Sequence, residues 1–128
     1  MSVQWSENLS IGHDGLDHQH QELFQVTSML DHAIHSHDVS KLNDILHFLE
    51  DYVVSHFKDE EDFMLKTHYD EYDFHKKEHD QFKKTVEGLR NFYDSHTSNT
   101  HIIFKIRQCI DEMILHIITV DSKLTHHE

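Results

Sequence analysis

The chain has 128 residues, a formal net charge of −13, one cysteine and no proline. This length suits one domain that buries a core without disulfides. The negative charge would repel nucleic-acid phosphates and anionic lipid, and no apolar run approaches the roughly 20 residues of a membrane span, so neither nucleic acid nor membrane is an expected partner.

Composition favours helix and a reducing compartment. Proline is absent, there are only three glycines, and helix formers such as Leu, Glu and Lys are plentiful, so we predict an all-α fold. Cys109 has no partner for an internal disulfide, and residues 1–5 have neither the basic start nor the apolar run of a signal peptide. We therefore expect a cytoplasmic protein.

Residues 1–15 are predicted to form an irregular N-terminal arm, because Ser, Asn, Gly and Asp interrupt any helical pattern there. Trp5, Leu9 and Ile11 would pack this arm over one end of a helical bundle. The arm is therefore expected to be a strap and not a separate domain.

A first helix is predicted over residues 16–36, with Asp14 or Asp17 near its N-terminal cap. Its inward positions alternate in steps of four and three, and they are Leu16, His20, Leu23, Thr27, Leu30 and Ile34. This pattern is typical of a helix with one face in a core.

A second helix is predicted over residues 40–66. Its inward stripe is Leu42, Ile45, Leu46, Leu49, Val53, His56, Glu60 and Met64. His56 and Glu60 occupy positions where apolar residues belong. Residues four apart share one face of a helix, so this pair can reach a single metal ion.

Two more helices are predicted, over residues 71–94 and 100–124. The third has the inward stripe His75, His79, Phe82, Val86, Leu89 and Tyr93, and the fourth has Ile102, Ile106, Cys109, Met113, His116 and Val120. His75 and His79 repeat the four-residue spacing, so the second and third helices would present two metal-binding pairs across a tight hairpin.

Four helices of similar length with short connections predict an antiparallel up-down-up-down four-helix bundle. In that topology the polar residues of all four stripes fall at one end. Asp121 joins this layer five residues after His116, although such a step leaves two side chains about 140° apart on a helix of 3.6 residues per turn. Asp121 would therefore reach in from the flank, or the helix would widen locally into a π turn.

Burying imidazoles and carboxylates is costly unless a metal or a partner compensates them. Five histidines and two carboxylates exceed a tetrahedral zinc site but suit two octahedral ions that share both carboxylates as bridges. If one ion takes three imidazoles, the other takes two. With a bridging oxygen added, one coordination position stays open on the ion that has fewer histidines.

The segments that carry these residues resemble the hemerythrin family, particularly single-domain bacteriohemerythrins, over almost the whole chain. The resemblance implies a non-haem centre of two iron ions (Fe2+/Fe3+) bridged by an oxo or hydroxo group, with O2 as ligand. The positions that match the family's metal ligands are His20, His56, Glu60, His75, His79, His116 and Asp121. The resemblance also implies that His75, His79 and His116 hold one iron. His20 and His56 would hold the other, and Glu60 and Asp121 would bridge.

The chain departs from the family pattern one turn before the last histidine ligand, where Glu112 and Met113 replace the usual Trp-Leu. Met113 is expected to line the O2 pocket and Glu112 to face outward. Cys109 is expected to be a buried hydrophobe. Within the acidic run from Asp59 to Asp62, only Glu60 is expected to point inward. Surface positions are expected for His18, His32, His35, His37, His47, His68, His96, His101, His126 and His127, and His13 is ambiguous.

Reversible O2 binding for storage, delivery or scavenging is the function that the sequence favours, without enzymatic turnover. Two alternatives stay open. One is O2 or redox sensing through a partner, and the other is an enzyme that reduces peroxide or nitric oxide. Besides O2, a redox or O2-accepting protein is a candidate partner.

Overall fold

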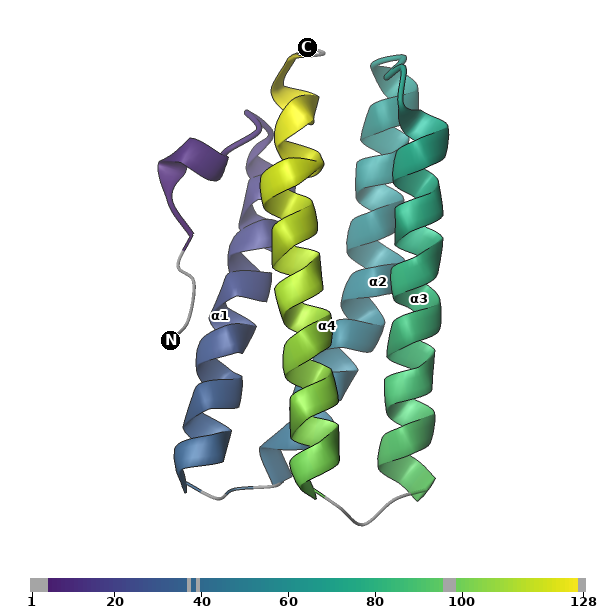
Figure 1. The fold of residues 1–128 in the computed structure, drawn as a ribbon. Helices are drawn as coiled ribbons and strands as arrows, with labels where there is room; N and C mark the ends of the chain where they lie inside the picture. Colours follow the sequence, from purple (N-terminus) through teal and green to yellow (C-terminus); the bar gives the residue numbers. More distant parts are fainter. Residues whose placement is uncertain (1–4, 37, 39, 96–98, 127–128) are drawn as a thin grey trace.

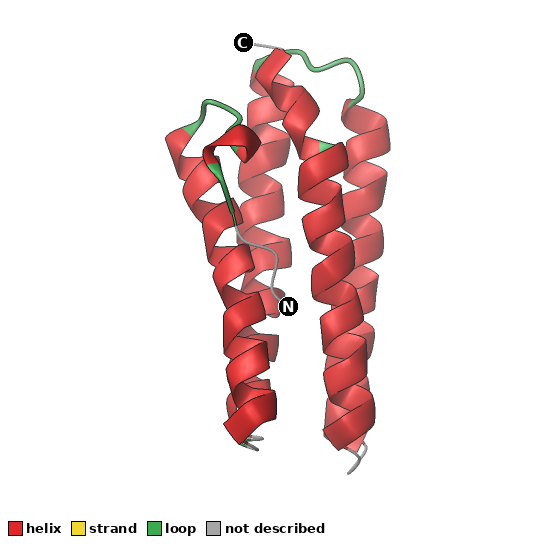
Figure 2. Ribbon diagram, turned by 60° about the vertical axis from the view of Figure 1, so that its left-hand side comes forward, coloured by secondary structure: helices red, strands yellow, loops and turns green. Residues whose placement is uncertain are grey.

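The computed structural model describes residues 5–36, 38, 40–95 and 99–126. Four α-helices run side by side: α1 (Asp14–Ser36), α2 (Ser40–Lys66), α3 (Tyr72–Ser95) and α4 (Asn99–Thr119) (Figure 1). Two 3-10 helices, η1 (Glu7–Leu9) and η2 (Asp121–His126), precede α1 and follow α4, and the described residues contain no strand (Figure 2). The predicted all-α class is confirmed.

The helices form an antiparallel up-down-up-down bundle. Successive helices run in opposite directions, and α4 closes the ring by packing against both α3 and α1 (Figure 1). Short connections enforce this order, since they leave each helix no choice but to return beside its predecessor. Among the described residues, none of the helices combines the length and the apolar surface that a membrane span needs.

The fourth helix is shorter than predicted. α4 ends at Thr119 instead of residue 124, and η2 follows it after a turn at Val120. The Val120 N–H still donates to the His116 carbonyl at 2.8 Å, whereas the Lys123 N–H donates to the Val120 carbonyl at 3.1 Å. The hydrogen bonding thus tightens from the α to the 3-10 pattern, and no π turn occurs in the described chain. The π-turn alternative for Asp121 was therefore wrong.

The start of α1 differs from the prediction in its capping residue. The Leu16 N–H donates to His13 Nδ1 at 3.1 Å, so His13 caps the helix. Asp17 instead accepts the Ile11 N–H at 2.9 Å and the Ser10 hydroxyl at 2.5 Å. Asp17 thereby ties the arm to the first turn of the helix.

The arm lies along the side of α1 as well as near one end of the bundle (Figure 1). Trp5 and Leu9 are half-buried against the main apolar cluster, which lies between the four helices. Ile11 is buried in a smaller cluster with Leu16 and Met64. The predicted strap therefore covers a flank of the bundle in addition to its end.

A left-handed residue ends α2. His68 has φ 56°, the Tyr69 N–H donates to the Met64 carbonyl at 2.9 Å, and the His68 N–H donates to the Leu65 carbonyl at 3.3 Å. These two bonds make a Schellman motif, in which glycine is the usual left-handed residue. Tyr69 and Met64 pack together in the smaller cluster. The turn directs the chain back into α3.

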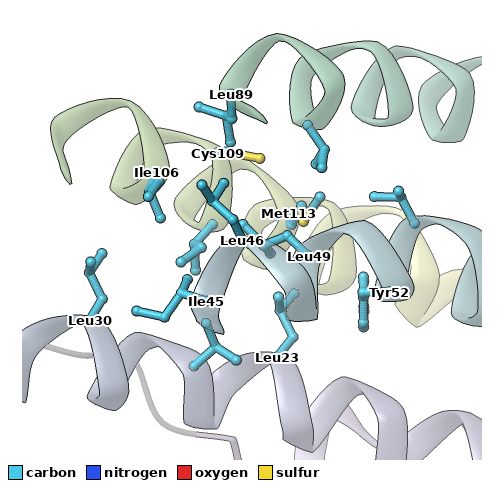
Figure 3. Packing of buried hydrophobic residues seen from close by; sticks show 14 of the residues in the cluster. Leu23, Leu30, Ile45, Leu46, Leu49, Tyr52, Leu89, Ile106, Cys109 and Met113 are labelled. Carbon is cyan, nitrogen blue, oxygen red and sulfur yellow. The ribbon is translucent and has the colours of Figure 1, made fainter. Parts of the chain in front are cut away.

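The polar layer at one end of the bundle lies between two apolar clusters. Along α1, Leu16 belongs to the smaller cluster, His20 to the polar layer and Leu23 to the main cluster. The main cluster brings together side chains from all four helices (Figure 3). Because apolar side chains close the polar layer above and below, the bundle itself keeps water away from it.

Candidate metal centre

Seven side chains meet in the polar layer, from all four helices and the start of η2. Each is almost fully buried, with relative exposures of 0% to 5%: His20, His56, Glu60, His75, His79, His116 and Asp121. They form two groups that share Glu60 and Asp121. Within each group, one potential ligand atom from every residue lies within 4.8 Å of the others.

The three-histidine half consists of His75, His79 and His116. Glu60 Oε1 lies 2.8 Å from His75 Nε2 and 2.9 Å from His79 Nε2. Asp121 Oδ1 lies 2.7 Å from His75 Nε2 and 3.0 Å from His116 Nε2. His75 Nε2 therefore faces both carboxylate oxygens, whereas His79 Nε2 faces that of Glu60 and His116 Nε2 that of Asp121.

The two-histidine half consists of His20 and His56. Glu60 Oε2 lies 3.1 Å from His20 Nε2 and 3.3 Å from His56 Nε2. Asp121 Oδ2 lies 3.1 Å from His20 Nε2. Each carboxylate thus turns one oxygen toward each half of the site.

Hydrogen bonds from the outer ring nitrogens orient three of the imidazoles. His56 Nδ1 lies 2.6 Å from Gln19 Oε1, His79 Nδ1 lies 2.8 Å from Glu61 Oε2, and His116 Nδ1 lies 2.7 Å from Glu78 Oε1. Oxygen acceptors require a proton on Nδ1, so the neutral rings carry their lone pair on Nε2. That lone pair faces the carboxylates, where a cation would bind.

Sequence reasoning missed these three acceptors and was wrong about Glu61. The Glu61 side chain is only 13% exposed and faces His79, so Glu60 is not alone in pointing inward from the acidic run. Each acceptor is adjacent in sequence to an inward residue: Gln19 to His20, Glu61 to Glu60, and Glu78 to His79. This adjacency was the available signal. The partner histidines lie 18 to 38 residues away, so only the packing of helices pairs them.

The donor set fits a resident metal. His75 Nε2 and His116 Nε2 are 3.2 Å apart and both face Asp121 Oδ1, so three potential donor atoms converge on one point. Asp121 Oδ1 and His56 Nε2 are buried and lack a hydrogen-bonding partner among the described residues, despite their short distances to neighbouring site atoms. Atoms that converge without hydrogen-bonding geometry satisfy one another when a cation lies between them.

Without a cation, protons hold the cluster together. Burial opposes the charged form of His20, but Asp121 and Glu60 outweigh it and raise the pKa of His20 to about 10. The same opposition and the same two carboxylates raise the pKa of His75 to about 9. Burial would raise the pKa of Glu60, but the imidazoles of His20, His56 and His75 around it hold this pKa well below its usual value. The two carboxylates therefore favour positive charge on the imidazoles around them.

Aromatic rings wall the site. Phe57 stacks on His79 with ring centroids 3.9 Å apart and an angle of 3°, and Tyr52 stacks on His56 at 4.5 Å and 24°. Phe82 meets His116 edge-on at 5.5 Å. These contacts fix the planes of the imidazoles and keep water from their faces.

The remaining predicted residues have definite places. Met113 is 2% exposed within the main cluster (Figure 3). Glu112 is exposed, as expected. Cys109 is a free, buried thiol whose pKa burial raises to about 12. His13 meets Phe63 edge-on at 5.1 Å in addition to capping α1. Exposed positions are confirmed for His18, His32, His35, His47, His68 and His101. His37, His96 and His127, and the side chain of His126, lie outside what the structure describes.

Two surface grooves approach the site. One, of about 690 Å³, lies between α1 and α2 and includes Gln19 and Asp59 in its lining. The other, of about 400 Å³, lies between α3 and α4 and includes Glu78 and His116. The outer acceptors Gln19 and Glu78 thus connect the buried rings to the surface.

Together these features describe a four-helix protein with a buried layer of side chains that could hold metal ions. The family profile described as "Hemerythrin HHE cation binding domain" matches residues 12–125. The chain therefore belongs to the hemerythrin family, as its sequence pattern predicted.

Several curated proteins are similar to this chain. A bacteriohemerythrin of Clostridium acetobutylicum is 32% identical over 89 residues, which cover 66% of this chain and 69% of the relative. A hemerythrin-like protein of Naegleria gruberi is 33% identical over 91 residues, 71% of each chain. A myohemerythrin of Sipunculus nudus is 29% identical over 119 residues, which cover 93% of this chain and 88% of the relative.

Proposed function

We propose that this protein binds O2 reversibly at a non-haem di-iron centre, for storage, delivery or scavenging of O2. Membership of the hemerythrin family supports the proposal, as do the relatives named bacteriohemerythrin and myohemerythrin. The observation that carries it is the orientation of Glu60 and Asp121, each with one oxygen toward each half of the site. Two carboxylates in that orientation suit a pair of bridged cations.

In this proposal the seven buried side chains would divide between the two irons. His75, His79 and His116 would hold one, and His20 and His56 would hold the other. Glu60, Asp121 and an oxo or hydroxo group would bridge them. The second iron would then have five ligands in place of six, which would leave one position for O2. Bound iron would supply the two electrons that O2 takes up on binding.

The remaining side chains keep the imidazoles in place and water out. The outer acceptors hold the rings with Nε2 inward, and Phe57 and Tyr52 cover two of the ring faces. Met113, buried in the main cluster, lines the O2 pocket in this proposal. Imidazoles outnumber carboxylates, unlike the glutamate-rich ferritin-like sites, so high iron oxidation states are less accessible. This donor set favours reversible binding over O–O cleavage.

We also propose that residues 1–128 act as one hemerythrin-like domain in the cytoplasm. The family match over residues 12–125 and the shared core of all four helices support a single domain. The free thiol of Cys109 accords with a reducing compartment. A redox or O2-accepting protein is the partner that we propose for a delivery role.

An optical titration tests the proposal. The protein is loaded with iron, analysed for metal content, reduced without air, exposed to O2 and then flushed with argon. We expect about two irons per chain and recovery of the colourless reduced form under argon. Zinc in place of iron would refute the proposal. Irreversible oxidation with turnover of peroxide would favour the alternative of an enzyme that reduces peroxide.

A pair of variants on α2 tests the ligand assignment. Glu60→Gln removes the charge shared by both halves, so the variant is expected to retain less than half of the iron of the wild type. Asp62→Asn, a change at a side chain 59% exposed on the same helix, is the matched control. Equal iron content in the two variants would contradict the role of Glu60.

A further inference from the structure

The two halves of the site differ in the charge of their outer acceptors. In the three-histidine half, His79 and His116 each face a carboxylate, from Glu61 and Glu78. In the two-histidine half, His56 faces the neutral amide of Gln19. His20 Nδ1 in this half and His75 Nδ1 in the other half are both buried and have no hydrogen-bonding partner within the described chain. Two negative charges therefore lie behind one half, and none directly behind the other.

Asp59 orients the amide of Gln19. Gln19 Nε2 donates to Asp59 Oδ2 at 2.9 Å. A carboxylate only accepts, so it selects the NH2 end of the amide and turns Oε1 toward His56. The relay from Asp59 through Gln19 to His56 therefore fixes both the amide and the ring tautomer, from the rim of the groove between α1 and α2.

We infer that Gln19 is a positioning residue that holds His56 as a neutral, weakly donating ligand, while Glu61 and Glu78 make His79 and His116 stronger donors. A carboxylate that accepts the Nδ1 proton increases the basicity of the metal-bound ring, and a neutral amide does so less. The three-histidine half is thereby biased toward Fe3+, and the two-histidine half, where O2 binds, is kept easier to reduce. This inference rests on the proposed function and specifies how the chain regulates that site.

A charge exchange between two neighbouring positions tests the inference without altering net charge. The double variant Gln19→Glu/Asp59→Asn moves the carboxylate from the rim to the position behind His56. Changes to residues that accept hydrogen bonds from metal-binding histidines alter metal affinity by roughly 10-fold to 100-fold. A 10-fold preference for Fe3+ corresponds to a fall of about 59 mV in a one-electron midpoint potential.

The opposite change on the other half gives the inference its signature. Glu78→Gln replaces the carboxylate behind His116 with an amide of the same shape. The midpoint potential of the iron centre in this variant is expected to rise by about as much as it falls in the double variant. Potentials of both variants and the wild type are measured by spectroelectrochemistry on iron-loaded protein, with autoxidation rates alongside. Because a lower potential favours Fe3+, the double variant is also expected to autoxidise faster than the wild type.

Controls separate charge from structure. Gln25→Glu adds a carboxylate at an exposed position of α1 and is expected to leave the potential at the wild-type value. Shifts of opposite sign in the double variant and in Glu78→Gln support the inference; unchanged potentials or shifts of the same sign overturn it. If the double variant fails to fold, the sign for Glu78→Gln still decides. If the wild type binds iron and O2 but the variants show no such shifts, this inference alone is refuted. If the wild type binds no iron, the proposed function is refuted.

Discussion

Raising the pH is expected to weaken the metal-free protein, because its folded state holds protons that the unfolded chain releases. Asp121 and Glu60 overcome the effect of burial and raise the pKa of His20 to about 10 and that of His75 to about 9. A histidine in the unfolded chain has a pKa of about 6.5. Below that value both states are protonated and the stabilisation is complete. Above it, stability falls until the pH passes the folded pKa values.

The expected loss is large. Each proton held only by the folded state lowers the free energy of unfolding by about 1.4 kcal/mol per pH unit. Two such protons lower it by about 3 kcal/mol per unit between roughly pH 7 and pH 9. A domain of this kind has a total stability of about 5–15 kcal/mol. Metal binding releases these protons, so stabilisation by a metal is expected to grow over the same pH range.

Urea denaturation followed by circular dichroism measures this slope, with a chelator present and the pH varied in steps across that range. His20→Gln is expected to flatten the curve by about the contribution of one proton. His18→Gln, which changes a side chain 73% exposed on the same helix, serves as the control and is expected to keep the wild-type slope. A stability that stays flat or rises between these pH values would refute the reasoning.

Three further predictions concern single side chains. Gly88→Ala is expected to add about 0.5–1 kcal/mol of stability in urea denaturation, because Gly88 is an exposed position of α3 where a new Cβ meets no atom within 4 Å; a loss of stability would contradict this account. Replacing His68, whose φ is 56°, with Gly is expected to add about 1 kcal/mol by relieving the left-handed backbone, and a lower thermal midpoint than the wild type would count against it. Met113→Leu, a nearly volume-conserving change, is expected to cost less than about 1.5 kcal/mol and to slow autoxidation of the iron-loaded protein, since a branched hydrocarbon replaces a flexible, polarizable thioether; an unchanged rate would remove Met113 from the O2 pocket.

Local sequence was enough to predict the bundle and the meeting of the seven polar residues. Inward positions repeat in steps of three and four, and this periodicity specifies the face of each helix before any tertiary contact forms. His56 and Glu60 stand out because they interrupt such a stripe, and both are 0% to 2% exposed. Short connections then determine which helix ends lie together. That these residues bind iron stays a prediction.

Tertiary structure decided what the periodicity could not. Asp121 lies beyond the end of α4, so its position follows from the turn at Val120 and not from a helical repeat. His13 caps the N-terminus of α1 because its Nδ1 accepts the Leu16 N–H. Gln19 pairs with His56 across 37 residues, and Glu78 pairs with His116 across 38. A sequence pattern records which residues share a helix face, but the partner on the next helix depends on how the helices are rotated and shifted when their side chains pack.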